Sequence, residues 1–278
     1  MMDAIATSLR EVDAAQFFAA LFIPEEQRSA VMVLRTFAAE MSRIPFLVSE
    51  PMLGEIRFQW WHEVLAGERE GEAAAHPLAS ALIQTVRKHS LPIAALQGLI
   101  AARVEDLYAD PPPTMNDLEG RLGECHSVPY RLASMILVPH SSASVADVAG
   151  HGGVAEGLAH LLAHWPLLLR RSRVMIPQDV MAQFGLNRDS VLAGTASAQT
   201  RTALRHIAGL AEKHRAQATA ALVGLRDSEA PAFLPLALVD PLLKRVHRTL
   251  PDDVASLPQW RIQFCLWRAS RRDVAKMF

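Results

Sequence analysis

Residues 152–186 read GGVAEGLAHLLAHWPLLLRRSRVMIPQDVMAQFGL, and this stretch carries the strongest fold signal in the chain. Leu and Ala recur in it at helical spacing, which predicts a helix over 151–171. Glu156, His160 and His164 lie at i, i+4 and i+8, so they share one stripe of that helix. Two histidines four residues apart can bind one metal ion. The alternative is a polar stripe that faces solvent or joins a hydrogen-bond network inside the protein.

The same helix is predicted to end in a basic segment. Pro166 should kink it, because proline removes a hydrogen-bond donor and clashes with the preceding turn. Arg170, Arg171 and Arg173 follow three leucines. Three arginines could bind a diphosphate through paired N–H groups. Cations also favour a helix C-terminus and water, so both interpretations stay open.

Helical periodicity dominates the rest of the chain, and strand-like alternation is scarce. A helix is predicted from Pro24 to Ile44-Pro45, and Ser49 is predicted to cap a second helix that Gly67 ends. Further helices are predicted over about 77–90, 92–109, 115–138, 195–225, 230–249 and 257–275, with short turns of helix over 143–149 and 178–184. We therefore expect an all-α fold, a single-domain helical bundle over 1–278 with a central cavity.

Composition excludes several classes of protein. A net charge of −1 and a pI near 6.8 leave no excess of cations, so no nucleic-acid partner is expected. Cys125 and Cys265 are far apart, which argues against a disulfide framework. Asp3 and Glu11 lie in an N-terminus without a basic region followed by an apolar run, so no leader peptide is predicted. No apolar run approaches the roughly 18 residues of a membrane span, and we expect a cytoplasmic protein.

Two further regions hold candidate residues. Asp106 lies near Arg103 in the segment AARVEDLYAD, where it could reach a cavity or belong to a solvated face. The stretch from Trp260 to Phe278 mixes aromatic and basic residues. It could be a basic amphipathic helix that contacts a membrane surface, or a packed final helix with an exposed basic face. A further stripe, predicted to pack in the core, consists of Ile56, Trp60 and Val64.

Three separated segments resemble the squalene/phytoene synthase family. They are RSAVMVLRTFAAEMSRI with VSEPMLGEIRFQWW, then LIAARVEDLYADPPPTMNDLEGRL, then residues 152–186, whose end SRVMIPQDVMAQFGL is the most specific part. The resemblance covers about residues 14–190 and implies the isoprenoid synthase fold. It also implies the family's chemistry. Active members condense two prenyl diphosphates head to head, and two DxxxD-type motifs bind magnesium through carboxylate oxygens.

The sequence departs from the family at these motifs. A gapless comparison places the first motif's aspartates at Ser42 and Phe46 and the second motif's at His164 and Leu168, so all four carboxylates are absent. Asp106 does match an acidic position of the family. The stretch VSEPMLGEIRFQWW also resembles the branch that includes the mitochondrial complex I assembly factor of squalene/phytoene synthase type.

These features lead to one leading hypothesis and two alternatives. The leading hypothesis is a catalytically degenerate member that binds a prenyl or other lipid-like ligand, or acts as an assembly or interaction factor, with no cofactor. The first alternative is an active head-to-head prenyl diphosphate transferase with rearranged, magnesium-binding ligands. The second is a membrane-surface adaptor that acts through the basic C-terminal helix. We expect Ser42 and Phe46 to face His164 and Leu168 across a cavity. The candidate ligand-binding residues are Asp106, Glu156, His160, Arg170, Arg171 and Arg173.

Overall fold

The computed structural model describes residues 2–194 and 198–278, and every regular element in these ranges is a helix. The first half contains α1 (Met2–Val12), α2 (Ala14–Ala20), α3 (Glu25–Leu47), α4 (Pro51–Ala66), α5 (Glu70–Ala75), α6 (Pro77–His89), α7 (Ile93–Val104), η1 (Glu105–Leu107), α8 (Met115–Leu122), the π-helical η2 (Gly123–Ser127) and α9 (Val128–Leu137). The second half contains α10 (Ser144–Ala163), α11 (Trp165–Arg170), α12 (Gln178–Gln183), α13 (Arg188–Ala193), α14 (Ala198–Ala221), η3 (Leu222–Gly224), α15 (Ala230–Phe233), η4 (Leu234–Leu238), α16 (Val239–Thr249), α17 (Gln259–Ser270) and η5 (Val274–Lys276). The predicted all-α class is confirmed. The first residues of the helix predicted over 195–225 lie outside the described residues.

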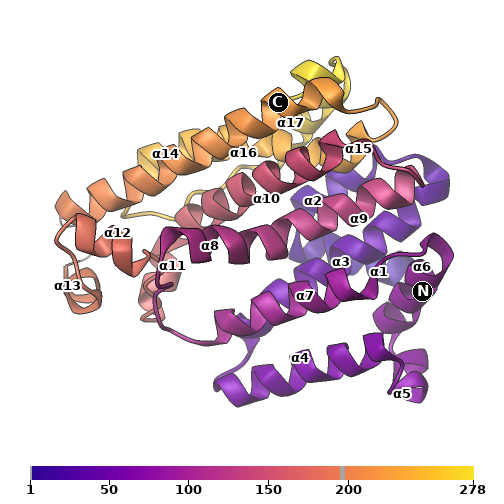
Figure 1. Ribbon diagram of the computed structural model, residues 1–278, viewed down its shortest axis with the longest axis horizontal. Helices are drawn as coiled ribbons and strands as arrows, with labels where there is room; N and C mark the ends of the chain where they lie inside the picture. Colours follow the sequence, from indigo (N-terminus) through magenta and orange to yellow (C-terminus); the bar gives the residue numbers. More distant parts are fainter. Residues whose placement is uncertain (1, 195–197) are drawn as a thin grey trace.

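Helix α10 runs through the middle of the bundle, as Figure 1 shows. It packs against α14 and α16 on one side and against α9 and η2 on the other. Its buried residues occur on every face, from Val145 to Ala163, as expected of a helix surrounded by others. At Gly153 an added Cβ would lie 2.6 Å from the backbone nitrogen of Ser127. The missing side chain therefore permits the close approach of α10 to η2.

Several predicted helix boundaries are confirmed and others are wrong. Gly67 ends α4 with a left-handed φ of 83°, as its sequence position predicts. The prediction that Ile44-Pro45 ends the first long helix is wrong, because α3 continues to Leu47. Pro45 is tolerated there because only one backbone hydrogen bond is lost before the helix stops. Helix α4 begins at Pro51, with Glu50 rather than Ser49 at the N-cap position.

The helix predicted over 151–171 differs at both ends. Helix α10 begins at Ser144, so it absorbs the short turn of helix predicted over 143–149. A break at His164 separates it from α11, and Pro166 occupies the first turn of α11. Proline fits a first helical turn, where its missing N–H would have no partner within the helix. The predicted kink is thus a complete interruption between two helices.

The structure shows two N-terminal helices and an orientation of α4 that the sequence analysis does not predict. Neither α1 nor α2 was expected, and α2 contributes to the polar interior described below. Helix α4 lies at the edge of the bundle, next to α7 and α3 (Figure 1). It buries Phe58 and Trp61, whereas Ile56 is 60% exposed. The prediction that Ile56 packs in the core is wrong, whereas Val64 of the same predicted stripe is buried and Trp60 is half-buried.

Candidate functional site

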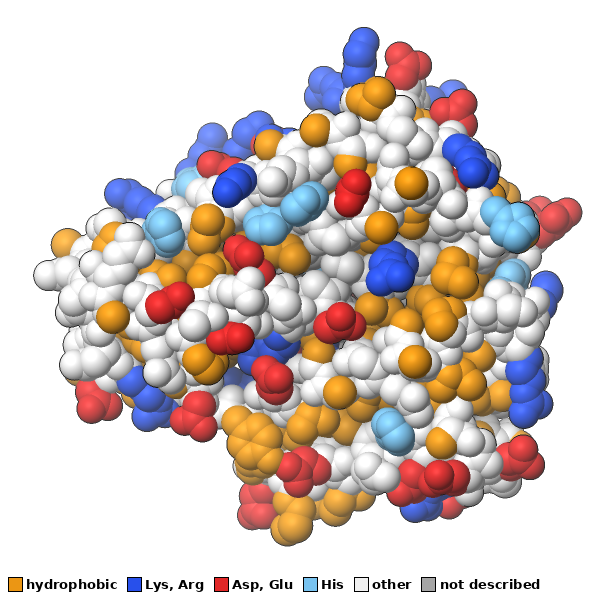
Figure 2. Space-filling view, in the orientation of Figure 1, with side chains coloured by type: hydrophobic (Ala, Val, Ile, Leu, Met, Phe, Trp, Pro, Cys, Tyr) orange, Lys and Arg blue, Asp and Glu red, His pale blue; other side chains and the backbone are white. Residues whose placement is uncertain are grey.

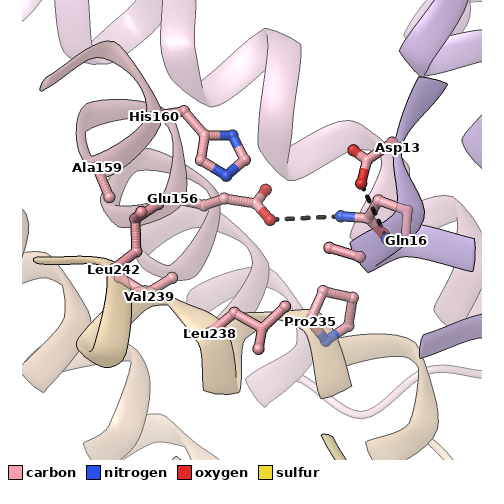
Figure 3. A pocket seen from close by; sticks show the side chains of 10 residues that line it. Asp13, Gln16, Glu156, Ala159, His160, Pro235, Leu238, Val239 and Leu242 are labelled. Carbon is pink, nitrogen blue, oxygen red and sulfur yellow. Dashed lines mark hydrogen bonds between the residues drawn. The ribbon is translucent and has the colours of Figure 1, made fainter. Parts of the chain in front are cut away.

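A buried carboxylate lies at the centre of the polar interior. Glu156 projects from α10, and its Oε1 accepts a hydrogen bond from the Tyr130 hydroxyl of α9 at 2.8 Å. Gln16 Nε2 of α2 lies 3.4 Å from the same oxygen, as Figure 3 shows. His126 Nδ1 of η2 lies 3.3 Å from Oε2. The N-terminal helix α2 therefore meets η2, α9 and α10, which follow more than a hundred residues later, at one side chain.

Two further charged residues support this centre. Arg35 of α3 is 4% exposed and donates to the carbonyl oxygens of Gln16 at 3.0 Å and Ala232 at 3.2 Å. It thereby joins the N-terminal helix α2 to the segment before η4. Asp13 caps α2, since its Oδ1 accepts a hydrogen bond from the backbone N–H of Gln16 at 3.0 Å. The Arg35 guanidinium and the Asp13 cap therefore hold α2 in the position that the hydrogen bonds to Glu156 require.

Burial and hydrogen bonding move the two carboxyl pKa values in opposite directions. Burial raises the pKa of Asp13, and the cap hydrogen bond and the charge of His160 only partly oppose this. Burial also acts to raise the pKa of Glu156, but the hydrogen bond from His126 and the charges of His160 and His126 outweigh it. The pKa of Glu156 is therefore below its ordinary value, so this carboxylate is ionised at neutral pH.

A small pocket opens beside Glu156. Its volume is about 50 Å³, and its polar lining is formed by Asp13, Gln16, Glu156 and His160 (Figure 3). Its apolar lining comes from η4 and α16, together with Ala15 of α2 and Ala159 of α10. Pockets for drug-sized ligands usually measure about 300–1,000 Å³, so this one has room for a few water molecules rather than a prenyl chain.

The predicted histidine stripe divides between the interior and the surface. Glu156 and His160 face the pocket, but His164 is exposed at the end of α10. Its Nδ1 lies 2.8 Å from the carbonyl oxygen of His160. Among the described residues, no group of three or more His, Cys, Asp or Glu side chains is placed to hold a metal ion. The structure thus does not assemble the three-residue metal set suggested by the helical spacing.

A second polar cluster surrounds Asp106, which lies in η1. Its Oδ2 accepts a hydrogen bond from Arg103 Nη1 at 3.0 Å, and its Oδ1 lies 3.7 Å from Arg121 Nη1. The Arg103 and Arg121 side chains are only 13% and 8% exposed. Within the described residues, Arg103 Nε and Arg121 Nη2 are buried without a hydrogen-bond partner. Asp106 therefore lies between two arginines that keep unused donors.

Arg173 adds to the positive charge of this cluster. Burial lowers the pKa of Arg173, the charge of Asp106 opposes this shift, and the charges of Arg171 and Arg121 add to it. We name Arg103, Asp106, Arg121 and Arg173 the arginine cluster. Glu105 Oε2 also lies 3.8 Å from Arg121 Nη1. The three arginines still outnumber the two nearby acids, so the field favours an anion over a metal cation.

One of the four positions matched to the lost aspartates, Phe46, lies near this cluster. Phe46, at the end of α3, is 43% exposed, and its ring lies 5.0 Å from the Arg171 guanidinium and 5.7 Å from that of Arg173. Arg171 Nη1 also donates to the Phe46 carbonyl oxygen at 3.3 Å. The end of α3 therefore meets the segment that follows α11.

The remaining matched positions are used locally. The Ser42 hydroxyl donates to the Ala39 carbonyl oxygen at 2.7 Å, Leu168 is buried, and Arg170 is exposed. None of the four matched positions lines the pocket beside Glu156. That Ser42 and Phe46 face His164 and Leu168 across a cavity stays a prediction.

Sequence reasoning missed half of the polar interior. Arg35, Arg121, His126 and Tyr130 were missed because their partners lie on other elements of the chain, and such pairing leaves no local mark. Asp13 was missed as well, although an Asp at the start of an apolar run is a helix-start signal that could have identified it.

The arrangement of helices is shared with enzymes of isoprenoid synthesis. A dehydrosqualene synthase superimposes with a TM-score of 0.77 at 13% identity, covering 96% of this chain and 94% of that one. Squalene synthase HpnC from Alicyclobacillus acidocaldarius superimposes with a TM-score of 0.73 at 17% identity, covering 89% and 93%. These likenesses define the fold as that of the isoprenoid synthases.

Sequence comparison identifies the family. The profile described as squalene/phytoene synthase matches residues 9–268, and the chain belongs to that family. Similar proteins include NADH dehydrogenase (ubiquinone) complex I, assembly factor 6, from Bos taurus, 27% identical over 240 residues, and from Homo sapiens, 26% identical over 240 residues. Each alignment covers 86% of this chain and 72% of the relative.

Proposed function

We propose that this chain is a catalytically degenerate squalene/phytoene synthase family member that acts as an assembly factor. The observation that carries the proposal is the state of Asp106. It is the acidic residue matched to the family's cavity, and its two carboxylate oxygens are directed at Arg103 and Arg121. A family site that holds magnesium needs free carboxylate oxygens, and here they are engaged by guanidinium groups.

The chemistry of the matched positions supports the same conclusion. Ionising a prenyl diphosphate requires a leaving group with several negative charges to be neutralised. Ser42, Phe46, His164 and Leu168 offer a hydroxyl, a phenyl ring, an imidazole and an isobutyl group. Magnesium selects hard oxygen ligands, and imidazole is a poor substitute. Glu156 is also unsuited to bind a metal ion, because His126 and Tyr130 already occupy its oxygens.

The named relatives support the assembly role. They are called complex I assembly factor 6, and the similarity extends over most of both chains. In the part of the chain that the structure describes, no helix is long and apolar enough to cross a bilayer. The cytoplasmic location stays a prediction.

Two assays test the proposal together. Purified protein is incubated with labelled farnesyl or geranylgeranyl diphosphate and Mg²⁺ or Mn²⁺, and we expect no condensation product. Deleting the gene in its own host should reduce the amount of assembled NADH dehydrogenase complex. Restoration of assembly by the wild-type chain and by an Asp106→Asn variant of normal abundance would show that metal binding there is dispensable. Phytoene, squalene or a cyclopropyl intermediate, formed by the wild type and lost in Asp106→Asn or Glu156→Gln, would show an active site with rearranged ligands.

A second proposal concerns the ligand of the arginine cluster. We propose that it binds an anionic group directly, without metal, such as the phosphate of a prenyl or other lipid-like molecule. The support is the pair of buried donors, Arg103 Nε and Arg121 Nη2, and the nearby Arg171 and Arg173. Calorimetric titration with inorganic pyrophosphate in EDTA should show binding that Arg121→Met abolishes. Arg170→Met, at an exposed position on α11, is the matched control. Binding that requires Mg²⁺ or survives Arg121→Met would contradict this proposal.

A further inference from the structure

The last long helix presents an apolar face to solvent. Trp260, Phe264 and Trp267 of α17 are 68%, 51% and 52% exposed. Because successive residues of a helix are rotated by about 100°, these three side chains fall on one stripe. The buried residues Leu266 and Ala269 fall on the opposite side, where α17 packs against α2 and η4. The aromatic stripe therefore projects away from the bundle.

Basic residues border this stripe. Arg268 is exposed next to Trp267, and Arg271 continues the stripe by one turn. From Trp260 to Phe278 the sequence contains five basic residues and one acidic residue, in a chain whose net charge is −1. The positive charge is therefore a local feature. Figure 2 shows basic side chains, with some acidic ones among them, along the upper edge of the molecule, where Figure 1 places α14 and α16 as well as α17.

We propose that α17 docks this protein onto an anionic lipid bilayer surface. Tryptophan and phenylalanine favour the boundary between headgroups and acyl chains, and arginines beside them attract anionic headgroups. The charges are almost all of one sign, which matches a continuous layer of anionic headgroups. Exposed aromatic and arginine side chains are also typical of protein–protein interfaces, and the experiment below distinguishes a protein partner from a bilayer.

This docking surface is separate from the arginine cluster. Figure 1 places α17 and α11 in different parts of the molecule. The inference also goes beyond the assembly role and does not depend on it. Loss of vesicle binding and loss of pyrophosphate binding are thus independent results.

The test is flotation of the full chain with vesicles of phosphatidylcholine alone or mixed with phosphatidylglycerol. We expect binding to the anionic vesicles only, weakened by salt. Arg268→Gln with Arg271→Gln should weaken it about 25-fold, since each arginine near the surface contributes roughly fivefold. Trp260→Ala with Trp267→Ala should weaken it by roughly tenfold or more. Both pairs are exposed, so we expect folding to be unaffected, which circular dichroism verifies.

Matched variants on other helices control for nonspecific binding to vesicles. Met52→Ala with Ile56→Ala removes two side chains of α4 that are 61% and 60% exposed. Arg205→Gln with Lys213→Gln removes two exposed cations of α14. Both controls should bind vesicles like the wild type. Equal loss in a control, or undiminished binding by the α17 variants, would overturn the proposal. A third outcome would also overturn it: the wild type does not bind vesicles but associates with itself or with another protein, and Trp260→Ala with Trp267→Ala abolishes that association.

Discussion

Replacing Asp106 by asparagine tests the arrangement on which the proposed function depends. The change keeps the size of the side chain but removes the charge that lies between Arg103 and Arg121. The hydrogen bond from Arg103 measures 3.0 Å, and bonds to charged groups contribute about 1.5–3 kcal/mol. The longer contact with Arg121 adds up to about 1 kcal/mol. We expect the free energy of unfolding to fall by about 2–4 kcal/mol.

Urea denaturation at pH 7, followed by circular dichroism, measures this loss. Asp110→Asn is the matched control, because Asp110 is exposed four residues later and its replacement should cost less than about 0.5 kcal/mol. Pyrophosphate in EDTA should stabilise Asp106→Asn more than the wild type, since the competing carboxylate is gone. At a hundred times the dissociation constant, such binding stabilises by about 2.7 kcal/mol.

Two results would refute this reasoning. If Asp106→Asn is as stable as Asp110→Asn, the arginines do not depend on that carboxylate. If pyrophosphate stabilises the wild type only with Mg²⁺, and Asp106→Asn not at all, then Asp106 holds a metal ion and the arginine cluster has been misinterpreted.

Three other predictions follow from the buried network and the helix contacts. Glu156→Leu should cost about 3–5 kcal/mol in urea denaturation, because it strands the buried donors of its partners, whereas Glu156→Gln should cost about half as much. Burial lowers the pKa of His126 from its ordinary value of 6.5. The stability that the neutral His126 side chain contributes is therefore present above pH 6.5 and is lost as the pH falls below 6.5. His126→Asn should therefore flatten the dependence of the unfolding free energy on pH between about pH 7 and pH 5. Gly153→Ala should lower the unfolding free energy by more than about 2 kcal/mol, because its Cβ would meet the Ser127 backbone. Gly150→Ala, with open space around it, should stabilise by up to about 1 kcal/mol, and a similar effect of both changes in thermal melts would contradict the predicted clash.

The sequence by itself determined the helical class, the family and several helix ends. These properties are recorded locally. Gly67 needs no tertiary partner to take a left-handed conformation. Apolar spacing within each segment suffices to predict a helix, and the order of three segments suffices to indicate the family. The loss of the carboxylates at Ser42, Phe46, His164 and Leu168 is likewise visible without coordinates.

Only the tertiary structure decided which side of each helix is buried and which polar groups meet. The apolar residues of α4 occur on more than one face, so the sequence could not show that Trp61 is buried and Ile56 exposed. Glu156 contacts Gln16 across 140 residues of sequence, and no local pattern predicts such a pair. The same holds for Asp106 and Arg121, whose meeting turns an acidic position of the family into the centre of a basic cluster. Helix spacing fixes neighbours within a few turns, whereas contacts between helices are set by how the whole bundle packs.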